Sequence, residues 1–386
     1  MPLRYRFLTK FQKLLIVGTL SWPSSQIHAQ VDFAFDQHVH APGQGAHFGD
    51  ALALSGQTLA AVDYDAGGSD AYIYLRDGNG WSPQAAIDLP GWNPQPTITP
   101  GAHARGRVAL AGDILVVGSP GDTIGGQADT GSIRIYRRSV GSWSFQQRID
   151  RPAAASIVGN FGASVAIDGD RMVVGAPGRT AYGRGSVYEY ARSGNNWSLA
   201  ATIESPVEFG RSFGQSLALA GDRLVIGLPH ARRAMVYRRV GSTWQAEASF
   251  TPASADPSVE FGASVALSGD YAFVGAPSGP APDGKAVHVY FRSGGTWGLT
   301  QRLAPIGASR FGRGLAVSGA RLAVGDPDQL DAVTQRRGRV HIYERNGLFW
   351  EERQTLRYPV SPSSALAMAG SRSTTSSPSS RSVAAA

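Results

Sequence analysis

The stretch "FGASVAIDGDRMVVGAP" (residues 161–177) decides the fold, because the chain repeats it almost unchanged as "FGASVALSGDYAFVGAP" (residues 261–277). Six copies of this pattern are marked by a turn glycine, at Gly56, Gly112, Gly169, Gly221, Gly269 and Gly319. The copies follow one another at about 50 residues, a period at which each repeat forms one supersecondary unit. The repetition therefore predicts an architecture rather than a catalytic motif.

Each copy contains four candidate strands. In the third copy these are residues 161–167, where apolar residues alternate, residues 171–177, residues 185–191, where aromatic residues recur at every second position, and residues 197–206. The pair Gly169-Asp170 between the first two segments suits a two-residue type II′ hairpin turn. A four-stranded antiparallel meander repeated radially is the blade of a β-propeller. The predicted fold class is therefore all-β, a β-propeller of four-stranded antiparallel blades.

The lengths of the connections separate the two faces of such a propeller. The spacing from the third-strand Tyr to the fourth-strand Trp, as from Tyr190 to Trp197, is the same in all six copies. The second-to-third-strand connection and the crossing to the next blade vary in length. In a meander these two connections leave on the same face, which we call the variable face. Because loops on a rigid scaffold commonly carry function, we expect a ligand to bind there.

The ends of the repeat region predict how the ring closes. Residues 31–42 resemble a fourth strand, and residues 365–370 resemble a first strand. A seventh blade shared between these segments would close the ring and cover its edges. Seven blades are therefore expected, six complete and the seventh incomplete, with a six-bladed ring as the alternative.

The residues that recur also carry a family resemblance. Phe161-Gly162 followed by Gly175-Ala176-Pro177 resembles the FG-GAP repeat, and the copy at residues 261–277 has the same pattern. That family includes the N-terminal seven-bladed propeller of integrin α subunits and many exported bacterial proteins. The resemblance covers roughly residues 30–370, and it implies the fold without naming a ligand. The DxDxDG calcium loop that integrin-type blades often carry between their first two strands is replaced here by two-residue turns.

The first 29 residues predict export. Four basic residues precede a short apolar stretch, residues 14–20, and Ala29 offers a small residue for cleavage. We therefore expect a signal peptide over residues 1–29, a propeller over residues 30–370 and a Ser-rich disordered or aberrant tail over residues 371–386. The expected location is secreted or periplasmic, with no transmembrane segment in the mature chain. The absence of cysteine excludes a thiol nucleophile and Cys-ligated zinc.

The charge distribution gives no sign of nucleic-acid binding. Of the net charge of +7, four positive charges lie within the first 13 residues, at Arg4, Arg6, Lys10 and Lys13. The rest of the chain contains no basic run interleaved with aromatic residues. Nucleic acid is therefore not an expected partner.

One acidic segment is a candidate metal site. Asp63, Asp65 and Asp70 flank two glycines, and carboxylates spaced in this way can wrap Ca²⁺. A solvated acidic turn is the favoured interpretation of this segment, and calcium binding is the alternative. No other cofactor is predicted.

The variable face supplies the candidate ligand-binding residues. Trp92 lies in the longest inter-blade crossing and can either stack on a ligand or pack its own loop. Five arginines come from the third and fourth blades, Arg179, Arg184, Arg211, Arg232 and Arg233, and all of these except Arg211 are candidate ligand-binding residues. Acidic residues lie on the second and sixth blades, at Asp122, Asp129, Asp326, Asp328 and Asp331. Ordinary surface charge is the favoured interpretation, and the alternative is a face that is basic on one side and acidic on the other and could orient a charged ligand.

These features favour a binding protein. No residue is assigned a catalytic role, because no nucleophile elbow, metalloprotease motif or phosphate loop is present. The leading hypothesis is an exported adhesion or binding module for an extracellular protein or glycan. The alternative is a polysaccharide hydrolase or lyase with loop carboxylates on the variable face. Paired acids converging near the propeller axis would favour this alternative.

Overall fold

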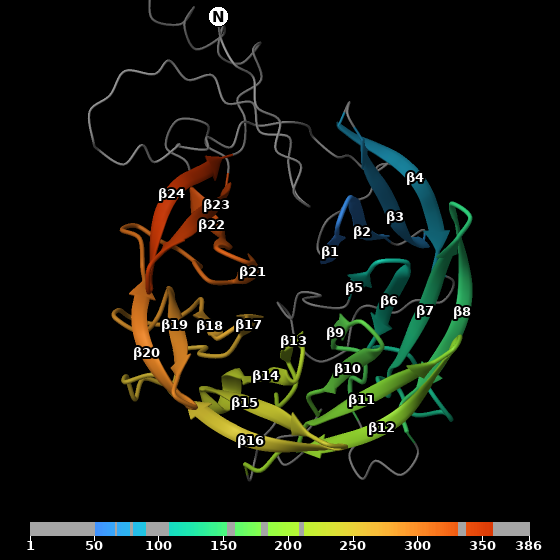
Figure 1. Cartoon of the computed structure of the whole chain (residues 1–386), viewed down its shortest axis with the longest axis horizontal. Helices are drawn as coiled ribbons and strands as arrows, with labels where there is room; N and C mark the ends of the chain where they lie inside the picture. The colour runs from blue at the N-terminus through green and yellow to red at the C-terminus, as the bar shows by residue number, and fades with distance from the viewer. Residues whose placement is uncertain are drawn as a thin grey trace, which may run out of the picture.

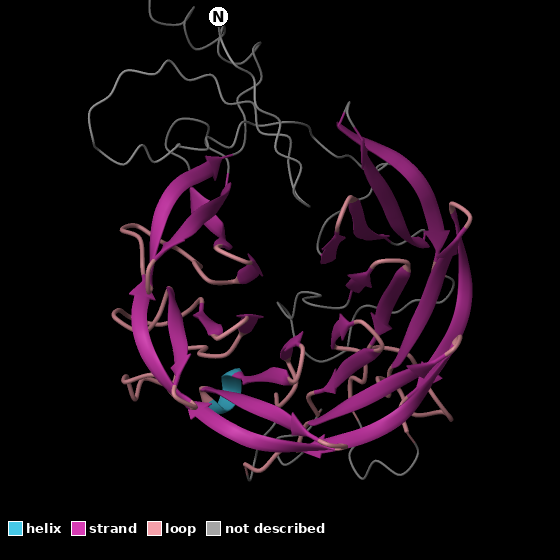
Figure 2. Cartoon of the chain, viewed as in Figure 1, coloured by secondary structure: helices cyan, strands magenta, loops and turns pink. Residues whose placement is uncertain are grey.

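The computed structural model describes residues 51–65, 68–77, 80–89, 108–152, 159–178, 184–207, 212–330 and 337–357. Within these ranges the chain forms six antiparallel sheets, each of four strands hydrogen-bonded in chain order. The sheets surround a central opening as the blades of a β-propeller, with the first strand of each blade innermost (Figure 1). Strands dominate this part of the chain, and a 3₁₀ turn, η1 (Pro229–Ala231), joins two strands of the fourth blade (Figure 2). The predicted fold class is confirmed.

The blades are numbered here in chain order. The strands of the first three blades are β1 (Ala51–Ser55), β2 (Thr58–Asp65), β3 (Gly68–Asp77), β4 (Gly80–Asp88), β5 (Val108–Ala111), β6 (Ile114–Ser119), β7 (Ser132–Ser139), β8 (Ser142–Asp150), β9 (Ser164–Asp168), β10 (Arg171–Ala176), β11 (Ser186–Ser193) and β12 (Asn196–Glu204). Those of the last three are β13 (Ser216–Ala220), β14 (Arg223–Leu228), β15 (Arg233–Val240), β16 (Thr243–Phe250), β17 (Ser264–Ser268), β18 (Tyr271–Ala276), β19 (Ala286–Ser293), β20 (Thr296–Leu303), β21 (Gly314–Ser318), β22 (Arg321–Leu330), β23 (Arg337–Asn346) and β24 (Phe349–Arg357).

The predicted hairpin turns are present. Asp168 pairs with Arg171, which leaves Gly169 and Asp170 as the two turn residues. Gly169 has φ of +59°, a conformation that glycine adopts without a Cβ clash. A glycine in the first turn position therefore fixes the register of this hairpin.

The Phe-Gly pair lies just before the first strand rather than inside it. β9 begins at Ser164, three residues after Phe161. The Gly162 amide donates a hydrogen bond to the Gly175 carbonyl oxygen across 3.0 Å, and the Phe161 side chain is fully buried. The aromatic residue therefore anchors a turn between neighbouring blades.

Every third-strand Tyr marks a β-bulge. The register of the third and fourth strands shifts immediately before this residue in all six described blades, as between Glu189 and Tyr190. Bulges increase the local twist of a strand pair, and here they recur at one place in each blade. The alternating sequence pattern alone did not predict them.

The hydrophobic core is divided among the spaces between neighbouring blades. Between the fifth and sixth blades, the Phe273 ring meets the Trp350 ring edge to face, with centroids 5.0 Å apart. Both side chains are at most 1% exposed. Aromatic pairs of this geometry stabilise the contact beyond the area they bury.

Close backbone contacts hold adjacent blades together near the axis. A Cβ added to Gly175 would lie 2.1 Å from the carbonyl oxygen of Gly214 in the next blade. The hydroxyl of Ser164 donates to that same carbonyl oxygen across 2.5 Å. The same glycine contact and serine hydrogen bond join the fourth blade to the fifth and the fifth blade to the sixth. The recurring glycine and serine therefore have a packing role.

The expected blade number is corrected from seven to six for the described residues. Residues 31–42 and 365–370, which were expected to share a seventh blade, lie outside them. Each innermost strand from β1 to β21 packs beside that of the next blade, whereas no comparable contact among the described residues joins β21 to β1. Two partial strand matches at the ends of a sequence cannot establish that a sheet forms between them.

Candidate ligand-binding site

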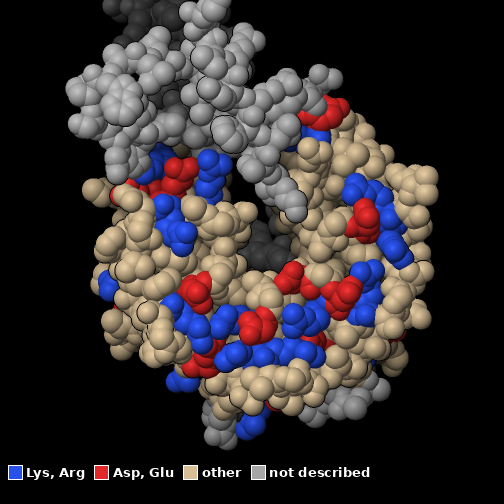
Figure 3. All heavy atoms as spheres, in the orientation of Figure 1, with Lys and Arg blue, Asp and Glu red and all other residues tan. Residues whose placement is uncertain are grey.

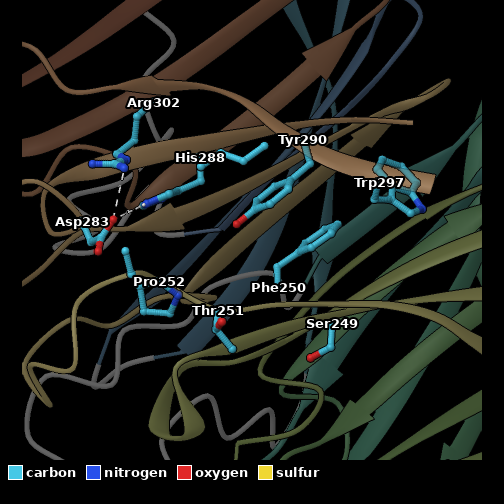
Figure 4. A pocket seen from close by; sticks show the side chains of 11 residues that line it. Ser249, Phe250, Thr251, Pro252, Asp283, His288, Tyr290, Trp297 and Arg302 are labelled. Carbon is cyan, nitrogen blue, oxygen red and sulfur yellow. Dashed lines mark hydrogen bonds and ion pairs between the residues drawn. The ribbon is translucent and has the colours of Figure 1, made fainter. Parts of the chain in front are cut away.

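A pocket of about 380 Å³ opens between the fourth and fifth blades. One wall is the end of β16 and the segment that follows it, residues 249–253, and the other comes from β19, β20 and the connection that precedes β19. Both connections belong to the variable face. Figure 4 shows the side chains of Asp283, His288 and Arg302 grouped at one side, with Tyr290, Phe250 and Trp297 following one another across the pocket.

The carboxylate of Asp283 is held by three groups. Its Oδ1 lies 3.1 Å from His288 Nε2 and 3.6 Å from Arg302 Nε. Its Oδ2 accepts a hydrogen bond of 2.5 Å from the backbone amide of Ser254. Asp283 and His288 are each 1% exposed. The carboxylate therefore joins the wall of the fourth blade to the strands of the fifth.

The surroundings set the charge of this pair. Burial alone would raise the pKa of Asp283, but hydrogen bonds from His288 and from the Ser254 amide hold the pKa below its ordinary value. Burial lowers the pKa of His288, and the neighbouring carboxylate offsets this only in part. At neutral pH the pair is therefore an ionised carboxylate beside a neutral imidazole.

An aromatic wall forms the second half of the pocket. Phe250 stacks on Tyr290 with ring centroids 3.7 Å apart and planes 5° apart, and it meets the Trp297 ring edge-on at 5.9 Å. At the position of Phe250 the other described blades have an aliphatic residue, Ile87, Ile149, Ile203, Leu303 or Leu356. This wall is therefore specific to the junction of the fourth and fifth blades.

The second blade contains a related cluster in which every charge is paired. Asp122 Oδ2 lies 3.4 Å from Arg134 Nη2 and 3.2 Å from Arg148 Nη2, and its side chain is 5% exposed. Arg148 also donates from Nε to Asp150 across 2.7 Å. Arg134 and Arg148 face each other across β7 and β8. This cluster is a closed structural network.

The fifth blade differs from the second at two of these positions. His288 and Arg302 face each other across β19 and β20, so they are the counterparts of the arginine pair in the second blade. The shorter imidazole replaces the first arginine. Ala304 occupies the position of Asp150, so the second arginine has no corresponding acid there. These two changes leave room and unused donor groups on the fifth blade.

Arg232, a predicted ligand-binding residue, holds one wall of the pocket. Its Nη1 donates to the carbonyl oxygens of Ser254 and Asp256, at 3.0 and 3.2 Å. Its backbone has φ of +50°, in the left-handed region that few residues with a Cβ adopt. The corresponding positions of the second and sixth blades are Gly131 and Gly338. Arg232 therefore positions the segment that donates the Ser254 amide to Asp283.

Of the other predicted ligand-binding residues, the two that the structure describes, Arg184 and Arg233, do not line this pocket. Arg233 begins β15, where its carbonyl oxygen packs against Gly262. Arg184 is exposed immediately before β11, in the third blade. Trp92 and Arg179 lie outside the described residues. The assignment of these four residues to ligand binding stays a prediction.

The predicted calcium residues lie at one end of the first blade. β2 and β3 form a tight hairpin in which Asp65 is opposite Gly68 and Asp63 is opposite Asp70. Asp88 on β4 is opposite Asp70 in turn, so three acidic positions form one row across the sheet. The hydroxyl of Tyr72 donates to Asp70 Oδ2 across 3.1 Å. Calcium binding at Asp63, Asp65 and Asp70 stays a prediction.

The acidic side that the alternative predicts for the variable face is wrong for three of its residues. Asp122, Asp129 and Asp326 are at most 6% exposed. Asp326 accepts hydrogen bonds from the backbone amides of Ser309 and Arg310, at 3.1 and 2.7 Å. These carboxylates hold connections in place and do not form a charged surface. Asp328 lies 3.7 Å from Arg310, and Asp331 lies outside the described residues.

A cavity of about 280 Å³ at the propeller axis is lined by no polar or ionisable side chain of the described residues. Every residue that lines it is Ala, Val, Leu or Ile, contributed by the innermost strands of all six described blades. The broad face seen in Figure 3 instead carries arginine and acidic side chains interspersed over the blades around the opening. Two ion pairs lie at hairpin turns of the blades, between Arg192 and Asp170 and between Arg138 and Asp113. Exposed pairs of this kind contribute little to stability.

The sequence interpretation missed Asp283, His288 and Arg302. One signal for His288 was available in the sequence. The residue two positions before the third-strand Tyr differs from blade to blade. In chain order it is Tyr72, Arg134, Tyr188, Met235, His288 and His341. Comparing copies at this position singles out the blades with an ionisable group. The partner Asp283 has no such signal, because it lies in a connection of variable length.

A comparison with protein-family models agrees with the repeat pattern. The model described as FG-GAP repeat matches residues 143–190 and 244–290. Each match runs from a fourth-strand Trp to the third-strand Tyr of the next blade, from Trp143 to Tyr190 and from Trp244 to Tyr290, so each spans one blade junction. The comparison with curated proteins gave no match. Among the described residues, none of the helical segments is long and apolar enough to cross a membrane.

Solved structures share the fold at low sequence identity. A protein from Lactobacillus plantarum matches with a TM-score of 0.57 and 15% identity, over 79% of this chain and 84% of that chain. The periplasmic gluconolactonase of Pseudomonas aeruginosa matches with a TM-score of 0.57 and 16% identity, over 83% of this chain and 86% of that chain. Identities of this size show the fold alone. The solved structures and the blade topology therefore show a β-propeller, and the family model shows FG-GAP repeats at residues 143–190 and 244–290 of this chain.

Proposed function

We propose that the protein is an exported binding module that performs no catalysis and holds its ligand in the pocket between the fourth and fifth blades. The observation that carries this proposal is the combination of a partly exposed guanidinium, Arg302, with the wall formed by Phe250, Tyr290 and Trp297. Apolar walls with a few placed polar groups are typical of ligand sites. An extracellular protein or glycan is the expected class of ligand.

The burial of the acid–base pair favours binding over catalysis. A general acid or base must come within hydrogen-bond reach of the group that it protonates or deprotonates. The side chains of Asp283 and His288 are 1% and 2% exposed, and both are engaged with each other. Their arrangement suits the support of Arg302 and of the Ser254 segment, and it leaves no accessible proton acceptor on the carboxylate.

A polysaccharide hydrolase or lyase remains the second candidate. The fold shared with a periplasmic gluconolactonase favours it, since that scaffold supports hydrolysis in the Pseudomonas protein. Accessible carboxylates converging near the axis were the expected signature of this alternative. The axial cavity of the described residues is lined by aliphatic side chains, which favours the binding proposal.

A glycan array, a set of extracellular proteins and a broad hydrolase and lyase panel separate the two candidates. We expect saturable binding that weakens when Phe250 is replaced by leucine, the residue that the fifth and sixth blades have at this position. Phe145→Leu, on an exposed outer-strand ring, is the matched control. Turnover of any polymer that disappears on changing a variable-face carboxylate would overturn the non-catalytic assignment.

The proposed function includes a secreted or periplasmic location. The basic and apolar pattern of residues 1–29 supports a cleaved signal peptide and a secreted or periplasmic protein. Mass determination of the mature chain from an expressing cell tests this, with Gln30 as the expected first residue.

We further propose that the terminal segments complete the ring with a seventh blade. In the first blade, Leu52 is 58% exposed, whereas its third-blade counterpart Val165 is 6% exposed. Gly325 in the sixth blade is the counterpart of Gly275, yet no backbone of another blade lies against it among the described residues. An exposed apolar residue and a small residue suited to an inter-blade contact support a further blade at this place.

A further inference from the structure

Lys285 occupies an unusual backbone position on the connection that supplies Asp283 to the pocket. It is the only lysine after residue 13, and arginine supplies the other permanently positive side chains beyond that residue. Its φ is +55°, and the corresponding position in the second blade is Gly131, with φ of +88°. A residue with a Cβ in this conformation is strained by about 1–3 kcal/mol, and such strain is concentrated at functional sites. The side chain is exposed and lies two residues from Asp283, which lines the pocket.

Arg302 has donor groups to spare. In the described part of the chain its ionic neighbour is Asp283, at 3.6 Å from Nε, and its side chain is 32% exposed. A guanidinium carries five N–H donors in a fixed fork. Its second-blade counterpart Arg148 is bound by two carboxylates, but the fifth blade has Ala304 in place of the second of these acids. One edge of the Arg302 fork is therefore available to a ligand.

The charges of the two related clusters differ. In the second blade, Asp122 and Asp150 balance the two arginines, so the cluster is neutral. In the fifth blade, Arg302 balances Asp283 and the imidazole is neutral, while Lys285 adds a positive charge that has no counterpart in the second blade. Arg302 and Asp283 balance each other within the pocket, and Lys285, on the connection that supplies Asp283, adds a positive charge near the pocket in sequence, which favours an anionic group in the ligand.

The shape of the site favours a saccharide over a peptide. The pocket is a pit of about 380 Å³, bounded by the ends of strands and by connections. Leu299 is 48% exposed in this pit, beside the partly exposed Trp297. A sugar ring offers an apolar face to such a wall and a polar edge to a cation. An acidic peptide bound as an added strand would instead need a long free edge.

We propose that this pocket binds an acidic saccharide, a glycan that carries a carboxylate such as a uronic acid, and that Arg302 and Lys285 select the carboxylate. This proposal rests on the proposed function, because it names the ligand class of the same site. Arg302 donates two N–H groups to the carboxylate, and the Lys285 ammonium compensates its charge. Phe250, Trp297 and Leu299 contact the sugar ring.

NMR of the full-length protein tests the proposal. Reductive methylation with ¹³C labels lysines and keeps their charge, and comparison with Lys285→Arg assigns the Lys285 signal. The probes are trigalacturonate, neutral maltotriose and a triglutamate peptide. We expect trigalacturonate to shift the Lys285 signal saturably. Maltotriose and triglutamate should bind at least about tenfold more weakly.

Two variants that copy the second blade sharpen the test. Ala304→Asp restores the acid that occupies the arginine fork, and Lys285→Gly restores the glycine. Each should weaken trigalacturonate binding about tenfold or more while leaving the thermal transition close to that of the wild type. The matched control Asp150→Ala, in the second blade, should leave the affinity unchanged.

Three results would overturn the proposal. They differ in whether they also contradict the proposed function of the pocket. Equal affinity for maltotriose, unchanged in both variants, removes the acidic-saccharide assignment but leaves a binding pocket. Tighter binding of triglutamate removes the saccharide class in favour of an acidic peptide. No shift of the Lys285 signal with any probe, together with glycan-array binding that Phe250→Leu leaves unchanged, removes the pocket itself and with it the proposed function.

Discussion

The hydroxyl of Ser264 donates a hydrogen bond to the carbonyl oxygen of Gly312 across 2.5 Å and so ties the fifth blade to the sixth. Equivalent bonds start from Ser164 and Ser216. Each serine follows a Phe-Gly pair, and each acceptor is the glycine of the next such pair. The repeat motif therefore specifies the contact between blades as well as the strand order inside a blade.

Removing one of these bonds should have a measurable cost. We expect Ser264→Ala to lower the free energy of unfolding by about 1–2 kcal/mol, because it leaves a buried carbonyl oxygen without its donor. Urea titration followed by tryptophan fluorescence measures the change. Ser293→Ala, at the exposed end of β19, is the control and should be neutral. Equal effects of the two variants would contradict the assigned role.

A glycine in the second strand of a blade tests whether another blade packs against its own blade. A Cβ at Gly275 would lie 2.2 Å from the Gly312 carbonyl oxygen, so Gly275→Ala should destabilise the protein by several kcal/mol, about 3 or more. At Gly325 the nearest backbone atom of the described residues is 3.6 Å away, in its own blade. If a seventh blade packs there, as we propose, Gly325→Ala should also be strongly destabilising. A neutral Gly325→Ala would leave the ring with the six described blades.

Much of the fold was predictable because its signals are local. The turn glycine at Gly169, the alternation along β11 and the fixed spacing from Tyr190 to Trp197 each concern residues within one hairpin. The blade number was not predictable in this way. It depends on whether segments at the two ends of the chain meet, and two short strand-like stretches do not determine a pairing so distant in sequence.

The candidate site was less predictable for a related reason. Asp122 and Asp326 looked like surface charges because they lie in variable connections, yet these connections fold back and bury them. Asp283 lies in such a connection too, and its partners come from two strands. Arg232 was selected from the sequence for its charge alone. Its contact with the Ser254 carbonyl oxygen depends on the path of the connection between β16 and β17, which the sequence around Arg232 does not determine.

The buried pair should make stability depend on pH. Because the pKa of His288 is lowered in the folded state, the unfolded chain binds a proton more readily below its own pKa of about 6.5. Stability is therefore complete above that pH and declines as the pH falls toward the folded-state pKa, by up to about 1.4 kcal/mol per pH unit. The lowered pKa of Asp283 adds a further loss below about pH 4.

Replacing the imidazole should remove the first of these slopes. We expect His288→Gln to be less stable than the wild type at pH 7 but to lose less stability between pH 6.5 and 5, in urea titrations at each pH. Ser293→Ala, which changes no titratable group, should keep the wild-type slope. A parallel pH dependence in His288→Gln and the wild type would show that another group titrates.

The row of acidic positions in the first blade predicts opposite results with and without calcium. Like charges directly opposite on neighbouring strands are destabilising, so Asp70→Asn should raise the free energy of unfolding by about 0.5 kcal/mol in buffer with a chelator. If Asp63, Asp65 and Asp70 bind Ca²⁺, added calcium should stabilise the wild type more than this variant. Equal melting temperatures with and without calcium for the wild type would remove the metal assignment.

Arg232 offers a test of how the pocket wall is held. Arg232→Gly relieves a left-handed backbone position, as glycine does at Gly131, but it removes the hydrogen bonds to Ser254 and Asp256. These effects oppose each other, so global stability should change by less than about 1 kcal/mol. Hydrogen exchange of residues 251–259 should nevertheless become faster, because the segment loses its anchor to the fourth blade. Arg233→Gly, at the neighbouring position, should leave exchange in this segment unchanged. If the segment keeps wild-type protection in Arg232→Gly, the Ser254 amide bond to Asp283 holds it without Arg232.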